Sequence, residues 1–173
     1  MAISYLQALQ QGIQALMAQD PRVLFLGEDV LDPYGGAFKV AAGLSTRYPD
    51  RVFTTPISEA GITGVGAGLA LRGYKPLVEI MFGDFLTLCA DQLVNHATKF
   101  PLMYPGVSCP LVLRTPVGGG RGYGPTHSQS LEKMFLGLPG LRVLATSREA
   151  LCMPVELLLP VKPLDTPPRD ATP

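Results

Sequence analysis

Acidic side chains stand where the sequence changes from apolar runs to polar or glycine-rich segments. Glu59 follows a short strand-like run and precedes an apolar helical segment, so we place it in the first turn of a helix. The helix dipole favours an acid at that position whatever the protein does. An acid at a sheet edge, beside a glycine-rich helix, could equally face a ligand and donate or shuttle a proton near neutral pH. The residues alone leave both interpretations of Glu59 open.

A second candidate, His127, lies just after the glycine-rich segment 118–124. Histidine titrates near neutral pH and loops carry functional groups, which favours a role for His127 over His96 in a helical segment. The glycine-rich segment completes no G-x-G-x-x-G pattern and no Lys-Ser/Thr pair follows it, which disfavours a dinucleotide-binding dehydrogenase or a P-loop protein. We expect an active-site loop there, because ligands of open α/β sheets bind beyond the carboxyl ends of the strands.

Aromatic and sulfur-containing residues complete the candidates. Phe82 and Phe85 separate a strand-like run from a helical segment, which suits core aromatics and equally suits a wall that stacks on a planar ring. No H-x-x-x-H pair or carboxylate cluster indicates a protein metal site. Cys89, Cys109 and Cys152 lie far apart without C-x-x-C spacing, which is typical of reduced residues in a cytoplasmic protein.

Alternating strand-like and helical segments must position these residues. Apolar residues at helical spacing predict helices at residues 3–17, 38–47, 58–72, 86–100 and 129–136. Short apolar runs predict strands at residues 23–26, 53–55, 76–80, 111–114 and 142–145. Apolar strands that alternate with helices predict an α/β fold, a parallel sheet with helices on both faces.

Composition narrows the class further. A chain of 173 residues that is 47% hydrophobic can form one domain with a substantial core. With 14 basic and 14 acidic residues, it offers no electrostatic basis for binding nucleic acid or an anionic membrane. The sequence shows no secretory signal and no apolar run of about 18–20 residues, so we expect a cytoplasmic protein without a membrane partner. Six prolines within residues 154–173 predict a disordered tail over 151–173, after a domain at 1–150.

Several motifs, in their order and spacing, resemble the beta subunit of the decarboxylating component of 2-oxo acid dehydrogenase complexes. That family includes pyruvate, branched-chain 2-oxo acid and acetoin dehydrogenases. The resemblance covers roughly residues 2–150 in unbroken order. Its motifs include Leu26-Gly27-Glu28-Asp29-Val30, Thr55-Pro56-Ile57-Ser58-Glu59, Glu79-Ile80-Met81-Phe82-Gly83-Asp84-Phe85 and His127-Ser128-Gln129.

The resemblance implies a thiamine-diphosphate-binding domain of the pyrimidine type. It implies that Glu59 hydrogen-bonds N1′ of the aminopyrimidine and so activates the cofactor for attack on a 2-oxo acid. It also implies that Phe85 stacks on the pyrimidine, while Ile57 and Met81 line its pocket. Glu28 matches an acid close to the cofactor, and His127 matches a histidine near the substrate and the lipoyl acceptor.

The same resemblance implies partners. In the family, a separate alpha subunit holds the diphosphate through Mg²⁺, within an alpha2beta2 heterotetramer. Here Gly83-Asp84 is followed by Phe85 instead of glycine, and the sole asparagine is Asn95, so we expect an alpha partner to supply the magnesium site. The lipoyl acyltransferase core and a 2-oxo acid are the other implied partners. The family's C-terminal domain is not recognised, so a second hypothesis is a truncated, non-catalytic module that retains the fold.

Overall fold

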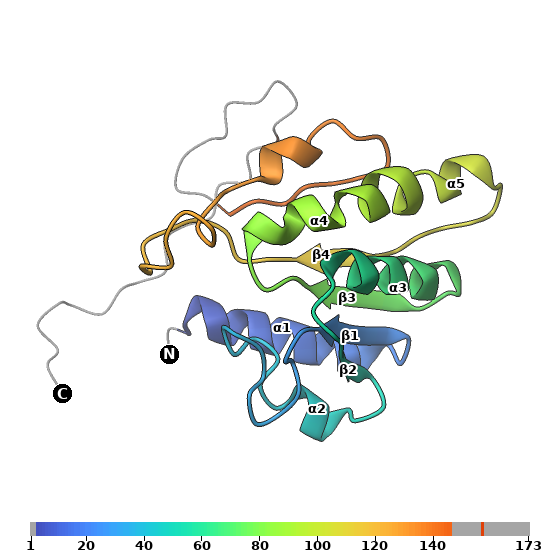
Figure 1. The fold of residues 1–173 in the computed structure, drawn as a ribbon. Helices are drawn as coiled ribbons and strands as arrows, with labels where there is room; N and C mark the ends of the chain where they lie inside the picture. The colour runs from blue at the N-terminus through green and yellow to red at the C-terminus, as the bar shows by residue number, and fades with distance from the viewer. Residues whose placement is uncertain (1–2, 147–156, 158–173) are drawn as a thin grey trace, which may run out of the picture.

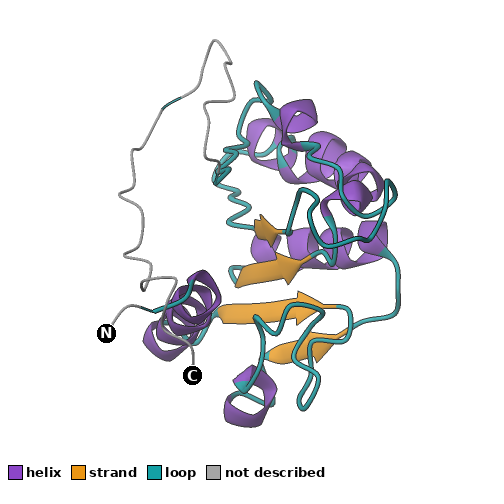
Figure 2. Cartoon of the chain, turned by 90° about the vertical axis from the view of Figure 1, so that its left-hand side faces the viewer, coloured by secondary structure: helices purple, strands orange, loops and turns teal. Residues whose placement is uncertain are grey.

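Four parallel strands form the sheet at the centre of the computed structural model, which describes residues 3–146 and residue 157 (Figure 1). The strand order is β2-β1-β3-β4. The strands are β1 (Val23–Gly27), β2 (Val52–Thr54), β3 (Lys75–Glu79) and β4 (Val112–Arg114). Helix α1 (Tyr5–Gln19) packs on one side of the sheet, and α3 (Glu59–Leu71) with α4 (Leu86–Asp91) packs on the other (Figure 2). The predicted α/β fold with a parallel sheet is confirmed.

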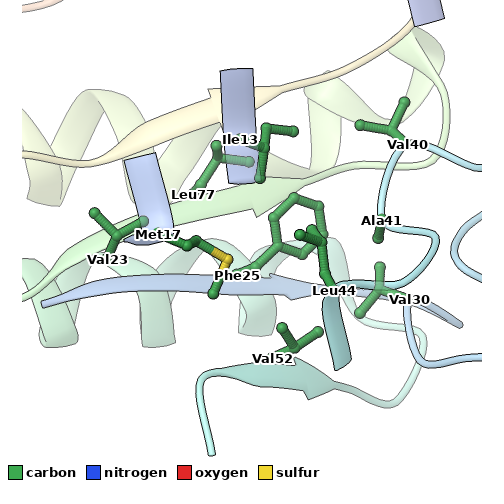
Figure 3. Packing of buried hydrophobic residues seen from close by; sticks show 10 residues of the cluster. All are labelled: Ile13, Met17, Val23, Phe25, Val30, Val40, Ala41, Leu44, Val52 and Leu77. Carbon is green, nitrogen blue, oxygen red and sulfur yellow. The ribbon is translucent and has the colours of Figure 1, made fainter. Parts of the chain in front are cut away.

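The first core lies between α1 and the sheet. A capping box starts α1: Ser4 Oγ accepts a hydrogen bond from Gln7 N, and Gln7 Oε1 accepts one from Ser4 N. The helix then turns its apolar side to the sheet, where Met17 and Phe25 are almost wholly buried. Figure 3 shows the ten buried residues of this cluster: Ile13, Met17, Val23, Phe25, Val30, Val40, Ala41, Leu44, Val52 and Leu77.

The second core lies on the opposite face. Alternate residues of the central strands supply it, because neighbouring side chains of a strand point to opposite faces. Leu24, Leu26 and Val78 face α3 and α4 there, while Phe25 and Leu77 face α1. Gly66 brings α3 close to the sheet, since a Cβ at that position would lie 2.7 Å from Val78 Cγ2. This explains one of the glycines in an otherwise apolar helix.

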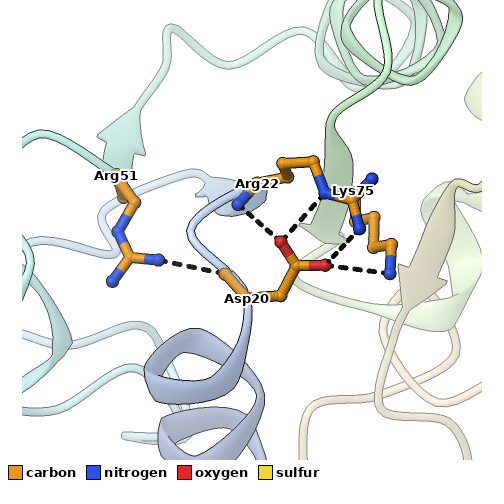
Figure 4. Close-up of polar contacts among 4 residues, drawn as sticks. All are labelled: Asp20, Arg22, Arg51 and Lys75. Carbon is orange, nitrogen blue, oxygen red and sulfur yellow. Dashed lines mark hydrogen bonds and ion pairs between the residues drawn. The ribbon is translucent and has the colours of Figure 1, made fainter.

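A polar cluster fixes the amino-terminal ends of β1 and β3 (Figure 4). Asp20 ends α1, and its carboxylate contacts Arg22 at 2.7 Å and Lys75 at 2.9 Å. Arg51 donates hydrogen bonds to the backbone carbonyls of Met17 and Asp20, which ties the approach to β2 to the end of the helix. The two basic neighbours hold the pKa of Asp20 well below its usual range. This end of the sheet is therefore occupied by structural contacts.

Three helical predictions differ from the structure in length or type. Residues 38–47 form only the short α2 (Leu44–Arg47), because Lys39 and Gly43 adopt left-handed backbone angles that interrupt a helix. Residues 129–136 form only a 3₁₀ turn (Glu132–Phe135), because Gln129 is hydrogen-bonded elsewhere. Between residues 86 and 103 the chain runs through α4, a π-helical segment (Gln92–Ala97) and α5 (Phe100–Met103). A 3₁₀ turn (Gly83–Phe85) precedes α4.

The predicted strand at residues 142–145 is wrong. These residues pair with no strand among the residues that the structure describes, and the chain before them turns at Gly137 and Gly140, both with positive φ. Leu141 and Val143 instead pack against the second core. The predicted disordered tail, apart from the exposed Leu157, lies outside the described residues. Within the described part of the chain, no helix has the length and apolar character needed to cross a membrane.

Candidate functional site

The four strands end in line at their carboxyl edge. Gly27 pairs with Thr54 on one side and with Glu79 on the other, and Glu79 pairs with Arg114. All six predicted site residues lie on segments that leave this edge, the place where ligands of parallel α/β sheets bind. Gly27 is needed there, because a Cβ would lie 2.8 Å from Val30 Cγ1 and 3.0 Å from Glu79 O.

Glu59 is the first residue of α3, and only 6% of it is exposed. Ser58 caps the helix, with its Oγ accepting a hydrogen bond from Gly61 N. The backbone carbonyl of Glu59 accepts a hydrogen bond of 2.7 Å from Thr63 Oγ1, and the Cys89 thiol lies 3.8 Å from the same oxygen. Every hydrogen bond that Glu59 makes within the described chain uses its backbone. Its carboxyl oxygens therefore remain available to hydrogen-bond a ligand.

Glu28 forms an acidic pair with Glu59. It follows β1 directly and is 7% exposed, and its Oε1 is buried without a hydrogen-bond partner among the described residues. Burial, together with the charges of Glu59 and Asp29, raises the pKa of Glu28 above its usual value. Asp29 turns the chain away at this point with a left-handed φ of 51°, a conformation that Asp tolerates better than most residues. Glu28 therefore holds its proton to a higher pH than an exposed glutamate does.

Aromatic side chains gather beside the segment that follows β3. The Phe82 ring contacts the rings of Phe38, Tyr123 and His127, with centroids at 5.6, 5.5 and 4.7 Å. Phe85 lies 6.0 Å from Phe82 and 5.4 Å from His127. The structure thus brings the predicted His127 and Phe85 together, although they are 42 positions apart in the sequence.

Cys89 connects the acidic and aromatic parts. Its sulfur lies 3.8 Å from the Glu59 carbonyl and 3.5 Å from the Phe85 carbonyl, both within reach of the thiol proton. Burial raises the pKa of Cys89 to about 11, and the charges of Glu59 and Glu28 act in the same direction. The thiol therefore stays neutral at physiological pH and acts as a donor. The sequence indicated a reduced core cysteine, and its contact with both site segments was not predicted.

Ile57 and Met81 do not join this cluster through a contact that the structure shows. Ile57 is 80% exposed, and Met81, two residues after the end of β3, is half-buried. Ile57 is thus an apolar side chain that the described chain leaves uncovered, two residues before Glu59 in the sequence. The pocket role predicted for these two residues stays a prediction.

The family model for the transketolase pyrimidine-binding domain matches residues 1–153. The chain belongs to this family. The solved structure of a split gene transketolase, an inactive beta4 tetramer, supports the fold of this pyrimidine-binding domain. It has a TM-score of 0.58 and 21% sequence identity, and the match covers 80% of this chain and 41% of that one.

The curated relatives include beta subunits of pyruvate and 2-oxoisovalerate dehydrogenases. The chain is 43% identical over 140 residues to the mitochondrial pyruvate dehydrogenase E1 component subunit beta-1 of Arabidopsis thaliana, covering 80% of this chain and 38% of that protein. It is 41% identical over 148 residues to the corresponding beta subunit of Leifsonia xyli, with 84% and 44% covered. It is 40% identical over 147 residues to the 2-oxoisovalerate dehydrogenase subunit beta of Bacillus subtilis, with 84% and 45% covered. The chain spans less than half the length of these relatives.

Two further buried acids of the pyrimidine-binding domain were missed as site components. Glu79 Oε2 accepts a hydrogen bond of 2.8 Å from Arg114 Nη1, and burial raises the pKa of Glu79 although Arg114 lowers it. Asp84 accepts hydrogen bonds from the backbone N and the side-chain Nε2 of Gln129. Glu79 and Arg114 are 35 positions apart in the sequence, and Asp84 and Gln129 are 45 positions apart. Sequence spacing alone could not predict either contact, because both depend on the fold. No group of three metal-ligating side chains is present in the residues described.

Proposed function

We propose that the chain is the pyrimidine-binding beta-subunit part of a 2-oxo acid dehydrogenase decarboxylating component. It acts in the oxidative decarboxylation of a 2-oxo acid and the transfer of the acyl group to lipoyl groups. Support comes from the family match over residues 1–153 and from the named beta-subunit relatives at about two-fifths identity. The site residues are Glu28, Ile57, Glu59, Met81, Phe85 and His127.

One contrast among the buried acids carries the proposal. The described part of the chain buries four acidic side chains, and the protein itself satisfies two of them. Glu79 pairs with Arg114 and Asp84 with Gln129, whereas Glu28 Oε1 has no partner and Glu59 uses only its backbone. Buried polar groups without partners are costly, so they mark places where a ligand supplies the missing bond. Among the four buried acids, Glu28 and Glu59 are the two whose carboxyl groups accept no hydrogen bond from the described chain, and the sequence predicts that both bind the cofactor.

These residues fit thiamine diphosphate. A planar ring with a polar edge requires a hydrogen-bonding acid at that edge and an aromatic side chain at its face, and Glu59 and Phe85 offer both. Thiamine diphosphate supplies a carbon nucleophile and an electron sink for the loss of CO₂ from a 2-oxo acid. Glu59 would hold a proton at the edge of the pyrimidine, and Glu28, with its raised pKa, would keep the pair from carrying two charges.

An alpha subunit would complete the site and hold the Mg²⁺ of the diphosphate, in an alpha2beta2 heterotetramer that also meets a lipoyl acyltransferase core. Ile57, two residues before Glu59, is 80% exposed, and a large apolar side chain gains stability when a partner covers it, which is consistent with this arrangement. Residues 1–150 would form the pyrimidine-binding domain. Cytoplasmic location stays a prediction, and imaging of the tagged chain in its own cells tests it.

Co-expression with a candidate alpha subunit tests the function. Size-exclusion chromatography should show a complex, and the complex should release CO₂ from pyruvate or a branched-chain 2-oxo acid. Glu59→Gln should lower kcat by about a hundredfold or more, because general acid–base catalysis contributes about 10²–10⁴-fold. Asp50→Asn, at an exposed position away from the site, removes a charge as a control and should leave kcat unchanged.

Near-normal turnover by Glu59→Gln would refute the assigned role of Glu59. A chain that stays monomeric and inactive with every alpha subunit tried would favour the second hypothesis, a non-catalytic module that retains the fold. Circular dichroism of each variant separates loss of chemistry from loss of folding.

A further inference from the structure

The glycine-rich loop is held at both ends by the turn that carries Asp84. Gly83 N donates a hydrogen bond of 2.8 Å to Pro116 O, just before the loop, and Gly118 N donates one of 3.4 Å to Gln129 O, just after it. Residue 83 must be glycine here, because a Cβ would lie 2.5 Å from Val117 Cγ1. Residues 118–128 therefore form a loop whose two ends meet at one point on the sheet edge.

Asp84 devotes both carboxylate oxygens to this junction. Oδ2 accepts a hydrogen bond of 3.2 Å from Gln129 N, and Oδ1 accepts one of 2.9 Å from Gln129 Nε2. Asp84 is 9% exposed, so water competes weakly for these bonds. These two hydrogen bonds between Asp84 and Gln129, called the clasp below, fix the end of the loop.

Within the loop, aromatic contacts hold the interior. Tyr123 and His127 contact Phe82, and the Arg121 guanidinium lies 5.0 Å from the centre of the Phe38 ring. The alternate glycines of the loop have positive φ, and a Cβ at positions 120, 122 or 124 would meet no atom within 4 Å. The loop backbone is therefore loosely packed between its clasped end and its aromatic contacts.

We propose that Asp84 and Gln129 are positioning residues that set where His127 lies relative to Phe82 and Phe85. His127 is two residues from Gln129, so a shift of the clasp moves the imidazole directly. The inference rests on the proposed function for its meaning, since His127 matters if Phe85 and Glu59 bind a cofactor. The hydrogen bonds between Asp84 and Gln129 form within this chain and need no partner subunit.

Matched amide and acid variants test the clasp. Gln129→Glu places two carboxylates against each other and should release the loop, because like charges at hydrogen-bonding distance repel. Asp84→Asn should be tolerated, because its amide can accept from Gln129 N and donate to the Gln129 side-chain oxygen after that amide turns over. Combining Asp84→Asn with Gln129→Glu pairs an amide donor with a carboxylate and should restore the clasp.

Two measurements on the isolated chain report the position of the loop. Trypsin cleaves after Arg121, and Gln129→Glu should raise that cleavage rate about tenfold, since cleavage follows the population of the open form. The double variant should return the rate to within about threefold of the original chain. In proton NMR, Gln129→Glu should shift the ring protons of His127 and leave those of His96, the only other histidine, unchanged.

An unchanged cleavage rate and His127 signal in Gln129→Glu would overturn the proposal. So would a double variant that remains as open as Gln129→Glu, because loss of folding and not loss of the clasp would then explain the effect. The outcome is independent of the decarboxylation assay. Full turnover by Glu59→Gln would refute the cofactor site while leaving the loop measurements as they stand.

Discussion

Replacing Arg114 by methionine tests how the ligand-facing edge of the sheet is held. Glu79 Oε2 lies 2.8 Å from Arg114 Nη1, with side-chain exposures of 5% for Glu79 and 20% for Arg114. Burial raises the pKa of Glu79, and Arg114 opposes this with the smaller effect. Methionine keeps an unbranched apolar side chain and removes the charge. The carboxyl group of Glu79 then stays buried without its counter-charge.

The unpaired carboxyl group can stay charged or take up a proton, and the magnitudes decide between these. A buried charge without a partner costs several kcal/mol. Protonating a glutamate at pH 7 costs about 3.7 kcal/mol, because each pH unit above its usual pKa of about 4.3 costs about 1.36 kcal/mol. At pH 5.5 the same protonation costs about 1.6 kcal/mol. Protonation therefore limits how much stability the variant can lose through the charge.

The sign follows from the raised pKa. An acid whose pKa is higher in the folded state gives its full stability at acidic pH and loses it as the pH rises. Arg114→Met should therefore lower the free energy of unfolding by up to about 3.7 kcal/mol at pH 7 and by up to about 1.6 kcal/mol at pH 5.5. Urea denaturation followed by circular dichroism at both pH values measures the two losses.

Two controls isolate the charge. Glu79→Gln combined with Arg114→Met has no titrating group at this position, so raising the pH from 5.5 to 7 should cost it less stability than it costs Arg114→Met. Lys75→Met removes one of the two basic partners of Asp20 at the protein surface and should cost less than about 1 kcal/mol, as surface ion pairs do. Equal losses for Arg114→Met at pH 5.5 and pH 7 would refute the protonation argument.

Other perturbations address the helix and the acid pair. Gly66→Ala should lower the free energy of unfolding by about 1–3 kcal/mol, since its Cβ would lie 2.7 Å from Val78 Cγ2. Gly68→Ala in the same helix meets no atom within 4 Å and should raise it by about 0.5–1 kcal/mol; equal effects in urea denaturation would contradict the packing argument. Glu28→Leu should raise the free energy of unfolding by about 1–3 kcal/mol at neutral pH, because it removes a buried oxygen without a partner. Since the pKa of Glu28 is raised, that gain should grow with pH while decarboxylation by the complex is lost, and a gain that shrinks with pH would contradict it.

Local patterns predicted the elements that are governed by local physics. Apolar runs located the four strands, and Ser58 marked the start of α3, so the position of Glu59 at a helix start followed from the sequence. The left-handed backbone at Lys39 could not be predicted, because no glycine or asparagine signals it, and the helix expected there proved much shorter. The contacts of Glu79 and Asp84 depend on which strands are neighbours and how the loop returns, and neither property is local.

The sheet edge carries two kinds of buried acid, those that hold segments in place and those that face the candidate site. Sequence patterns located this edge but did not distinguish the two kinds. All four buried acids follow or end apolar segments, so their local signals are alike. The tertiary structure separates them: Arg114 and Gln129 use up the bonding capacity of Glu79 and Asp84, and both pairs hold segments in place. Glu59 is held through its backbone carbonyl and Glu28 directly follows β1, and neither carboxyl group accepts a hydrogen bond from the described chain. A binding site requires this division, because groups that bind a ligand must be held firmly by contacts other than those the ligand will use.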